Sequence, residues 1–154
     1  MSRSVADPIT TADLPSMVGT HLGYSRWHTV EQEQINRFAD ATGDQQWIHV
    51  DPERAKTGPF GTTIAHGYLT LSMVPTFIFE ILDVHGSGMV VNYGLNKVRF
   101  PAPVPSGCRV RMGARVVGVE PISGGFHLTL DCTFEVEGQA KPACVAEILY
   151  RYYA

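Results

Sequence analysis

The chain has 154 residues, of which 44% are apolar and 18% are charged, and its formal charge is -3. These values are typical of a single globular domain, which we expect to span residues 1–154, and they argue against a nucleic-acid-binding protein. Three scattered cysteines predict reduced thiols rather than a disulfide framework. The polar N-terminus has no signal-peptide core, so we expect a cytoplasmic location.

The first part of the chain has weak patterns. Residues 1–20 are mostly polar, and we expect a loosely ordered N-terminal arm with a short helical turn near residues 14–18. Residues 21–30 alternate weakly between polar and apolar and include a tyrosine and a tryptophan. This alternation predicts a strand.

Two helices are then predicted from their end signals. Thr29 is suited to cap the first helix, with Gln32 as its capping-box partner. The apolar spacing continues to about residue 42, and Gly43 is a typical residue after a helix C-terminus. Asp51 followed by Pro52 predicts the start of a second, short helix.

A central helix is predicted over residues 66–82. The preceding residues 56–63 contain glycine and proline and indicate a loop. Apolar residues occur on nearly all sides of the helix, so it should be buried. His66, Pro75 and Glu80 lie within the segment and argue against a membrane span.

The second half of the chain changes to the two-residue period of strands. Turn residues separate four runs, and the alternation is clearest in the third. The runs are residues 89–100, 109–119, 125–136 and 144–153. A buried helix followed by an antiparallel meander predicts an α+β domain, with the sheet curled around the helix.

A loop between the first two helices carries the first candidate site. Asp44 and His49 lie there, five residues apart. A histidine exchanges protons near neutral pH, and a neighbouring carboxylate can orient it or help to position a water. The alternative is structural: Asp44 could cap the turn after Gly43, and His49 could be a hydrogen-bonded, partly buried side chain.

A second candidate is the pair His66 and Gly67 at the predicted start of the central helix. The first N–H groups of a helix have no internal partner, and a glycine N–H can be approached closely by a carbonyl. Such a donor could form an oxyanion hole. Gly67 could instead serve close packing of helix on sheet, and His66 could be a satisfied core histidine.

Other kinds of site have less support. Asp44, His49, Asp51 and His66 could form a metal site, but Asp51 is explained as a helix cap and no HxxxH or HxH spacing occurs. No nucleophile elbow or phosphate-binding loop is present. Trp47 could line a pocket or belong to the core. The basic residues at 97–115 could bind a phosphorylated ligand or form a solvated strand face.

Four segments resemble the MaoC-like dehydratases, also called R-specific enoyl-CoA hydratases or hydratase 2, and especially their NodN-like branch. They are FADATGD at 38–44, WIHVDP at 47–52, AHGYLTLS at 65–72 and VRFPAPV at 98–104. The resemblance covers most of residues 20–153. It implies a hot-dog fold, in which the sheet wraps a central helix, and a homodimer in which two sheets join edge to edge.

The resemblance also implies roles for single residues. The family's catalytic aspartate and histidine correspond to Asp44 and His49, and its oxyanion-hole glycine corresponds to Gly67. The commoner family motif has Asn-Pro where this chain has Gln46 and Trp47. This departure lies in the loop that would contact the substrate.

The activity implied is the reversible hydration of trans-2-enoyl thioesters to (R)-3-hydroxyacyl thioesters. The substrate would be an acyl-CoA or acyl carrier protein thioester, with His66 among the substrate-binding residues and Lys97 and Arg99 near its phosphates. No metal or other cofactor is needed, because the thioester already acidifies C2. The alternatives are a thioesterase on the same fold and a non-catalytic accessory protein that binds acyl thioesters.

Overall fold

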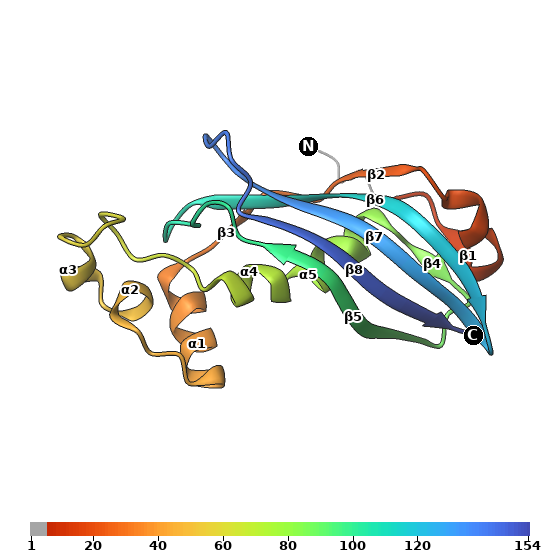
Figure 1. Cartoon of the computed structure of the whole chain (residues 1–154), viewed down its shortest axis with the longest axis horizontal. Helices are drawn as coiled ribbons and strands as arrows, with labels where there is room; N and C mark the ends of the chain where they lie inside the picture. The colour runs from red at the N-terminus through yellow and green to blue at the C-terminus, as the bar shows by residue number, and fades with distance from the viewer. Residues whose placement is uncertain (1–5) are drawn as a thin grey trace.

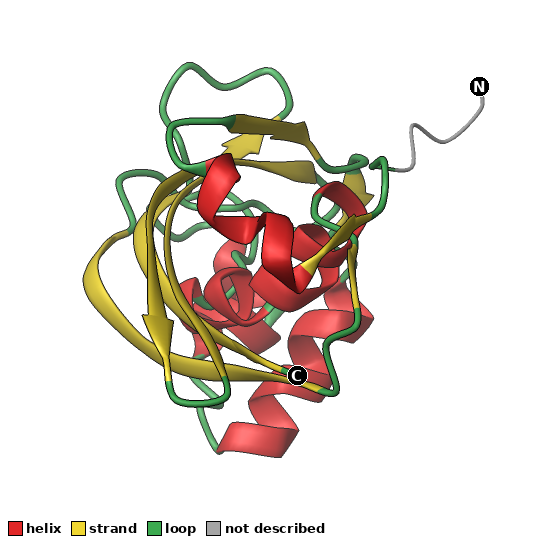
Figure 2. Cartoon of the chain, turned by 90° about the vertical axis from the view of Figure 1, so that its right-hand side faces the viewer, coloured by secondary structure: helices red, strands yellow, loops and turns green. Residues whose placement is uncertain are grey.

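A six-stranded antiparallel sheet is the largest structural unit of the molecule. The computed structural model describes residues 6–154, and its main sheet has the strand order β2-β6-β7-β8-β5, with the short β3 paired to β6. Figure 2 shows the sheet curled around the helices. The predicted α+β architecture is therefore confirmed. Its strands are β2 (His21–Tyr24), β3 (His28–Thr29), β5 (Met89–Arg99), β6 (Arg109–Ile122), β7 (Gly125–Val136) and β8 (Cys144–Tyr153).

The long strands follow from their alternating side chains. In β7, Leu128, Leu130 and Phe134 are fully buried, while Asp131 and Thr133 between them are exposed. The predicted bounds of β7 and β8 are correct, whereas β6 extends three residues further, to Ile122. One face of β6, β7 and β8 is buried and forms the core against the helices.

The central helix is broken into two. Residues 66–82 were predicted as one helix, but the chain forms α4 (Gly67–Ser72) and α5 (Val74–Ile81), which meet at Met73. Pro75 explains the break, because it has no N–H to donate to the carbonyl of the preceding turn. Phe77 is nevertheless buried, as predicted. No helix within residues 6–154 has the length and apolarity needed to span a bilayer.

The N-terminal segment is more ordered than predicted. Residues 1–5 lie outside the described part of the chain, but β1 (Ile9–Thr10) pairs in parallel with β4 (Val84–His85). The 3-10 helix η1 (Thr11–Met17) follows, and Leu14 is fully buried in the core. The expectation of a loose arm is wrong for residues 9–20 because Leu14 anchors them.

The predicted strand over residues 21–30 is also interrupted. β2 and β3 are separated at residues 25–27, where Ser25 Oγ accepts the backbone N–H of Met112 at 2.9 Å. Thr29 belongs to β3, and the next helix, α1 (Gln32–Thr42), has Glu31 as its N-cap. The predicted capping box is therefore wrong, and the Gln32 side chain is free to make other contacts.

The cysteine thiols provide a test of the core. Cys132 and Cys144 are buried, and burial raises the pKa of Cys132 to about 12 and that of Cys144 to about 11. Because the thiolate is the reactive form, we expect Ellman's reagent to label only the half-buried Cys108 in the native protein. All three thiols should react after denaturation. Fast labelling of three native thiols would contradict this placement.

Candidate active site

The loop after α1 lies at one end of the sheet (Figure 1). Asp44 in this loop lies close to His49. Gly43 ends α1 in the left-handed region, with φ of 89°, and its N–H donates to the carbonyl of Ala39 at 2.8 Å. The chain then enters α2 (Trp47–Val50), which carries His49. His49 Nε2 lies 3.9 Å from Asp44 Oδ2. This distance is too long for a hydrogen bond.

The orientation of His49 is set by a backbone carbonyl. The ring is buried, and Nδ1 lies 2.7 Å from the carbonyl oxygen of Ile64. A carbonyl oxygen only accepts hydrogen bonds, so Nδ1 carries the proton and Nε2 has a free lone pair in the neutral ring. That lone pair is on the side of Asp44, whose carboxylate is 41% exposed. Sequence reasoning missed Ile64, because its side chain gives no signal for a contact made by its carbonyl.

His66 packs against the imidazole ring of His49. Their rings stack with centroids 3.8 Å apart and an interplanar angle of 23°. His66 Nε2 lies 3.0 Å from the backbone carbonyl of Asp44, to which it donates. Phe38 covers the ring at a centroid distance of 4.9 Å. His66 is thus buried among the residues that hold the pair.

The imidazole geometry does not fit a metal ion. Possible ligand atoms of Asp44, His49 and His66 lie within 4.8 Å of one another. However, a metal ion lies near the plane of each imidazole that binds it. Because the rings of His49 and His66 are stacked, no position within bonding distance of both rings lies near both ring planes. Asp51, which the sequence also suggested, caps α3 (Pro52–Ala55) by accepting the N–H of Arg54 at 3.1 Å.

A cavity of about 270 Å³ opens beside His49. Gly67 lines it at the first residue of α4, so its N–H has no partner within the helix. A methyl group added to Gly67 would lie 3.1 Å from the ring of Phe100, another lining residue. Gly67 therefore packs closely against Phe100 and also has an N–H without a partner in its own helix. Apolar residues form most of the remaining wall: Phe60, Ile64, Ala65, Pro101, Ala102, Pro103, Val104 and Ala143.

Comparison with known proteins places the chain in a family. The model described as a MaoC like domain matches residues 13–131. The chain belongs to the MaoC-like family.

Two curated relatives span nearly the whole chain. The 3-hydroxyacyl-thioester dehydratase Z of Mycobacterium tuberculosis is 57% identical over 146 residues, which cover 94% of this chain and 97% of that protein. Nodulation protein N of Rhizobium leguminosarum bv. viciae is 46% identical, over 90% of this chain and 88% of its own. The suggested likeness to the NodN-like branch is therefore confirmed.

A solved structure shares the fold of this MaoC-like protein. The unliganded R-hydratase PhaJ1 from Pseudomonas aeruginosa superposes with a TM-score of 0.77 over 94% of this chain and 86% of that one. The two sequences are 22% identical, so the likeness concerns the fold alone. It confirms the predicted hot-dog arrangement.

The two positions that depart from the commoner MaoC-like motif have local structural roles. Gln46 is the N-cap of α2, and its carbonyl accepts the N–H of His49 at 3.0 Å. Trp47 occupies the first helical position and packs against Gly58, where an added methyl group would lie 2.8 Å from the indole. The guanidinium of Arg54 lies 4.4 Å from the indole centroid. Trp47 thus holds α2, α3 and the following loop together.

The basic residues predicted near the site are spread over the sheet of this MaoC-like protein. Lys97 and Arg99 are exposed on β5 and do not line the cavity, although Arg99 directly precedes Phe100. Arg109 and Arg111 form ion pairs with Glu137 and Glu135, respectively. These two arginines therefore belong to a paired strand face.

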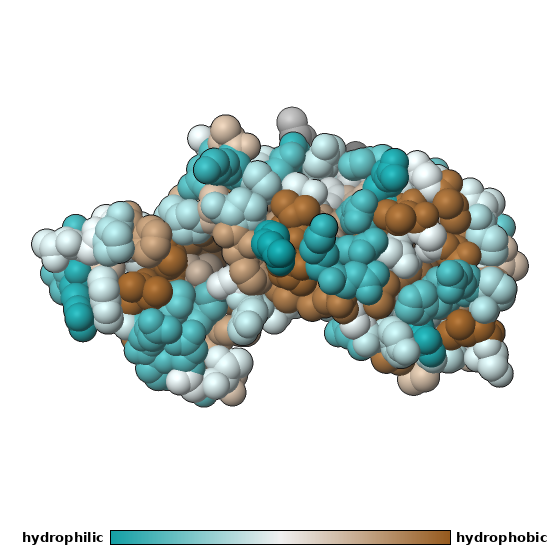
Figure 3. Space-filling view, viewed as in Figure 1, coloured by the Kyte–Doolittle hydropathy of each residue, from teal (hydrophilic) through white to brown (hydrophobic). Residues whose placement is uncertain are grey.

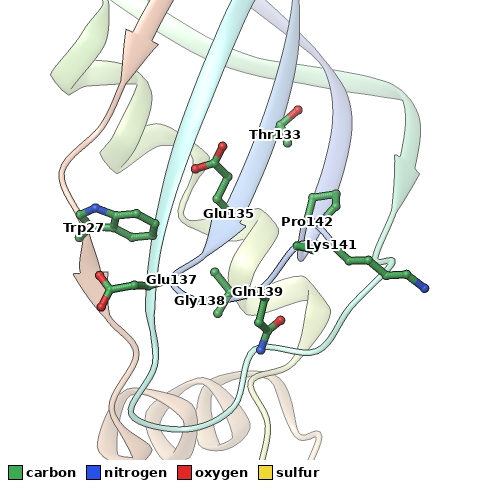
Figure 4. Close-up of a pocket in the computed structure, with 10 residues that line it drawn as sticks. Trp27, Thr133, Glu135, Glu137, Gly138, Gln139, Lys141 and Pro142 are labelled. Carbon is green, nitrogen blue, oxygen red and sulfur yellow. The ribbon is translucent and has the colours of Figure 1, made fainter.

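A second cavity, of about 370 Å³, lies by the hairpin between β7 and β8 (Figure 4). Trp27, Glu135, Glu137 and Lys141 are among its lining residues. Its two glutamates are the partners of the strand arginines, and His49 is not part of its wall. His49 therefore belongs to the smaller cavity, and Asp44 lies beside His49 but is not among the residues that line this cavity.

Proposed function

We propose that this MaoC-like protein is an R-specific enoyl-thioester hydratase that interconverts trans-2-enoyl and (R)-3-hydroxyacyl thioesters. The observation that carries the proposal is the free Nε2 of His49, 3.9 Å from the Asp44 carboxylate and next to the cavity that Gly67 lines. The dehydratase name of the 57% identical relative supports the same reaction.

The proposed chemistry uses these three groups. A water held between Asp44 and His49 attacks C3, and His49 Nε2 takes its proton. The electrons of the C2–C3 double bond move toward the thioester oxygen, where the N–H of Gly67 stabilises the developing charge. Asp44 then relays the proton to C2, so that one water has been added overall. Dehydration follows the same steps in reverse.

Substrate recognition follows from the walls of the cavity. Phe60 and Phe100 provide apolar surface for the acyl part. We assign Lys97 and Arg99 the phosphates of the carrier, which is CoA or acyl carrier protein, because both are exposed near the end of β5, which leads directly into Phe100. His66 contributes to binding indirectly by supporting His49. A cytoplasmic location stays a prediction.

A homodimer is part of the proposal. β5 is at the edge of the sheet, and Tyr93 and Leu95 on it are exposed apolar residues. Hydrophobic surface is visible among hydrophilic residues on the face that carries β5 (Figure 3). Such an edge is protected by pairing with a second copy.

Sedimentation of the wild type should give a dimer at micromolar concentration. Leu95→Glu should shift the population toward monomer, because it places a charge at the paired edge. Val145→Glu is the matched control, since Val145 is an exposed apolar residue on the interior strand β8. A monomeric wild type would contradict the proposal.

The activity assay uses crotonyl-, octenoyl- and longer enoyl-CoA. We expect the ultraviolet absorbance of the conjugated thioester to fall without release of thiol, and chiral analysis to find the (R)-3-hydroxyacyl product. Thiol release would indicate a thioesterase. Binding without turnover of any chain length would indicate an accessory protein, and either result would overturn the hydratase proposal.

A further inference from the structure

The side chain of Gln32 connects α1 to the candidate active site. Its amide nitrogen donates to the backbone carbonyl of His49 at 2.7 Å and to Asn36 Oδ1 at 2.9 Å. Its amide oxygen accepts a hydrogen bond from the hydroxyl of Thr63. The residue predicted to close a capping box is thus turned toward His49.

Thr63 and Ile64 form the segment that orients the imidazole. Thr63 is buried, and the N–H of Ile64 donates to the carbonyl of Ile48 at 3.0 Å. The carbonyl of Ile64 accepts the Nδ1–H of His49. Gln32 therefore holds both the main chain of His49 and the segment that selects its tautomer.

We infer that Gln32 is a positioning residue for His49, an inference that rests on the proposed hydratase function. Of the two flipped orientations of the Gln32 side-chain amide, only one satisfies its partners. In this orientation the nitrogen faces two acceptors and the oxygen faces one donor. Without that amide, His49 and the segment at Thr63 lose their common anchor. A shift of about 1 Å at a reacting group can lower a rate by about 10²-fold.

Gln32→Met removes the amide while keeping a side chain of similar length. We expect kcat to fall by about 10- to 10²-fold while KM stays within about twofold, because the reacting geometry changes and the apolar cavity does not. Gln34→Met is the matched control. Gln34 lies on the same helix but bonds to His28 and Met73, so its replacement should leave kcat within about twofold of wild type.

Nitrogen NMR of the imidazole provides a readout that a general loss of stability does not change. At about pH 8, where an ordinary imidazole is neutral, wild-type His49 should be protonated on Nδ1 alone. Gln32→Met should introduce a population protonated on Nε2. Thr63→Val, which replaces the hydroxyl with a methyl group of similar size, should do the same. This variant provides the test if Gln32→Met does not fold.

The outcomes separate this inference from the proposed function. Any of three results would overturn the positioning role of Gln32. The first is a normal kcat in Gln32→Met, and the second is an equal loss of kcat in Gln34→Met. The third is a loss of kcat in Gln32→Met with the His49 tautomer unchanged. A wild type without hydration activity would refute the proposed function instead. In that case the tautomer spectra of Gln32→Met and Thr63→Val still decide whether Gln32 orients His49.

Discussion

Asp44→Asn and His49→Ala should each lower kcat/KM for enoyl-thioester hydration by about 10²- to 10⁴-fold, the usual contribution of a placed acid/base group. Asp44→Asn keeps the shape of the side chain but cannot relay a proton as a carboxylate does. His49→Ala removes the free Nε2 lone pair that faces Asp44. Steady-state kinetics measure the loss, and circular dichroism checks that each variant is folded.

The chain offers a matched control for this pair. Asp83 and His85 also form an aspartate–histidine contact, with 3.2 Å between Asp83 Oδ2 and His85 Nε2, but at the exposed surface beside β4. Asp83→Asn and His85→Ala should leave hydration unchanged. If folded Asp44→Asn and His49→Ala variants kept wild-type turnover, the assignment of the site would be wrong.

Gly67→Pro should lower kcat by about 10²- to 10³-fold, the cost of losing one oxyanion-hole donor. Proline is tolerated at the first helical position, and His66 has the extended backbone, with φ of -60° and ψ of 137°, that precedes proline readily. Gly67→Ala is the matched control, because it adds a Cβ beside Phe100 but keeps the N–H. Comparing the two variants separates the donor from the packing.

The packing effect has its own expected size. Gly67→Ala should cause a smaller loss than Gly67→Pro, and Phe100→Leu in the alanine background should recover part of it by relieving the contact near 3.1 Å. The proline variant should gain little from the same relief. Equal activity of the alanine and proline variants, both folded by circular dichroism, would show that the Gly67 N–H does not stabilise the reaction.

The alternating strands were predictable, because each residue contributes to one face or the other. Leu128, Leu130 and Phe134 face the core through a period that no distant contact changes. The break in the central helix was less evident. Its apolar residues continue past Pro75 without a change in pattern, and the break lies in the backbone hydrogen bonds at Met73.

Only the part of the candidate site formed by side chains close together in the sequence could be predicted. Asp44 and His49 lie five residues apart, in the loop after α1 and in α2, and this spacing made them candidates, while the resemblance to the MaoC-like family implied their catalytic roles. The contacts that orient them involve backbone carbonyls, from Ile64 to His49 and from Asp44 to His66. Such contacts leave no trace in residue types, and they join segments separated by 15 and 22 positions.

Gln32 illustrates a wrong local interpretation with a physical cause. Three residues after Thr29, it fits the spacing of a capping box. Pairing of Thr29 in β3 moves the helix start, and the side chain of Gln32 instead meets the carbonyl of His49. The tertiary fold, and not the spacing from Thr29, therefore determines the hydrogen-bond partner of Gln32.

Isotope labelling shows which carbon atom of the thioester the water attacks. The purified protein is given crotonyl-CoA in water enriched in the heavy oxygen isotope, and the products are analysed by mass spectrometry. We expect one heavy oxygen at C3 of an intact 3-hydroxybutyryl thioester, because hydration adds the water oxygen to that carbon. Heavy oxygen in a free carboxylic acid, with released CoA, would place the attack at the carbonyl carbon and contradict the assignment of this protein as a hydratase.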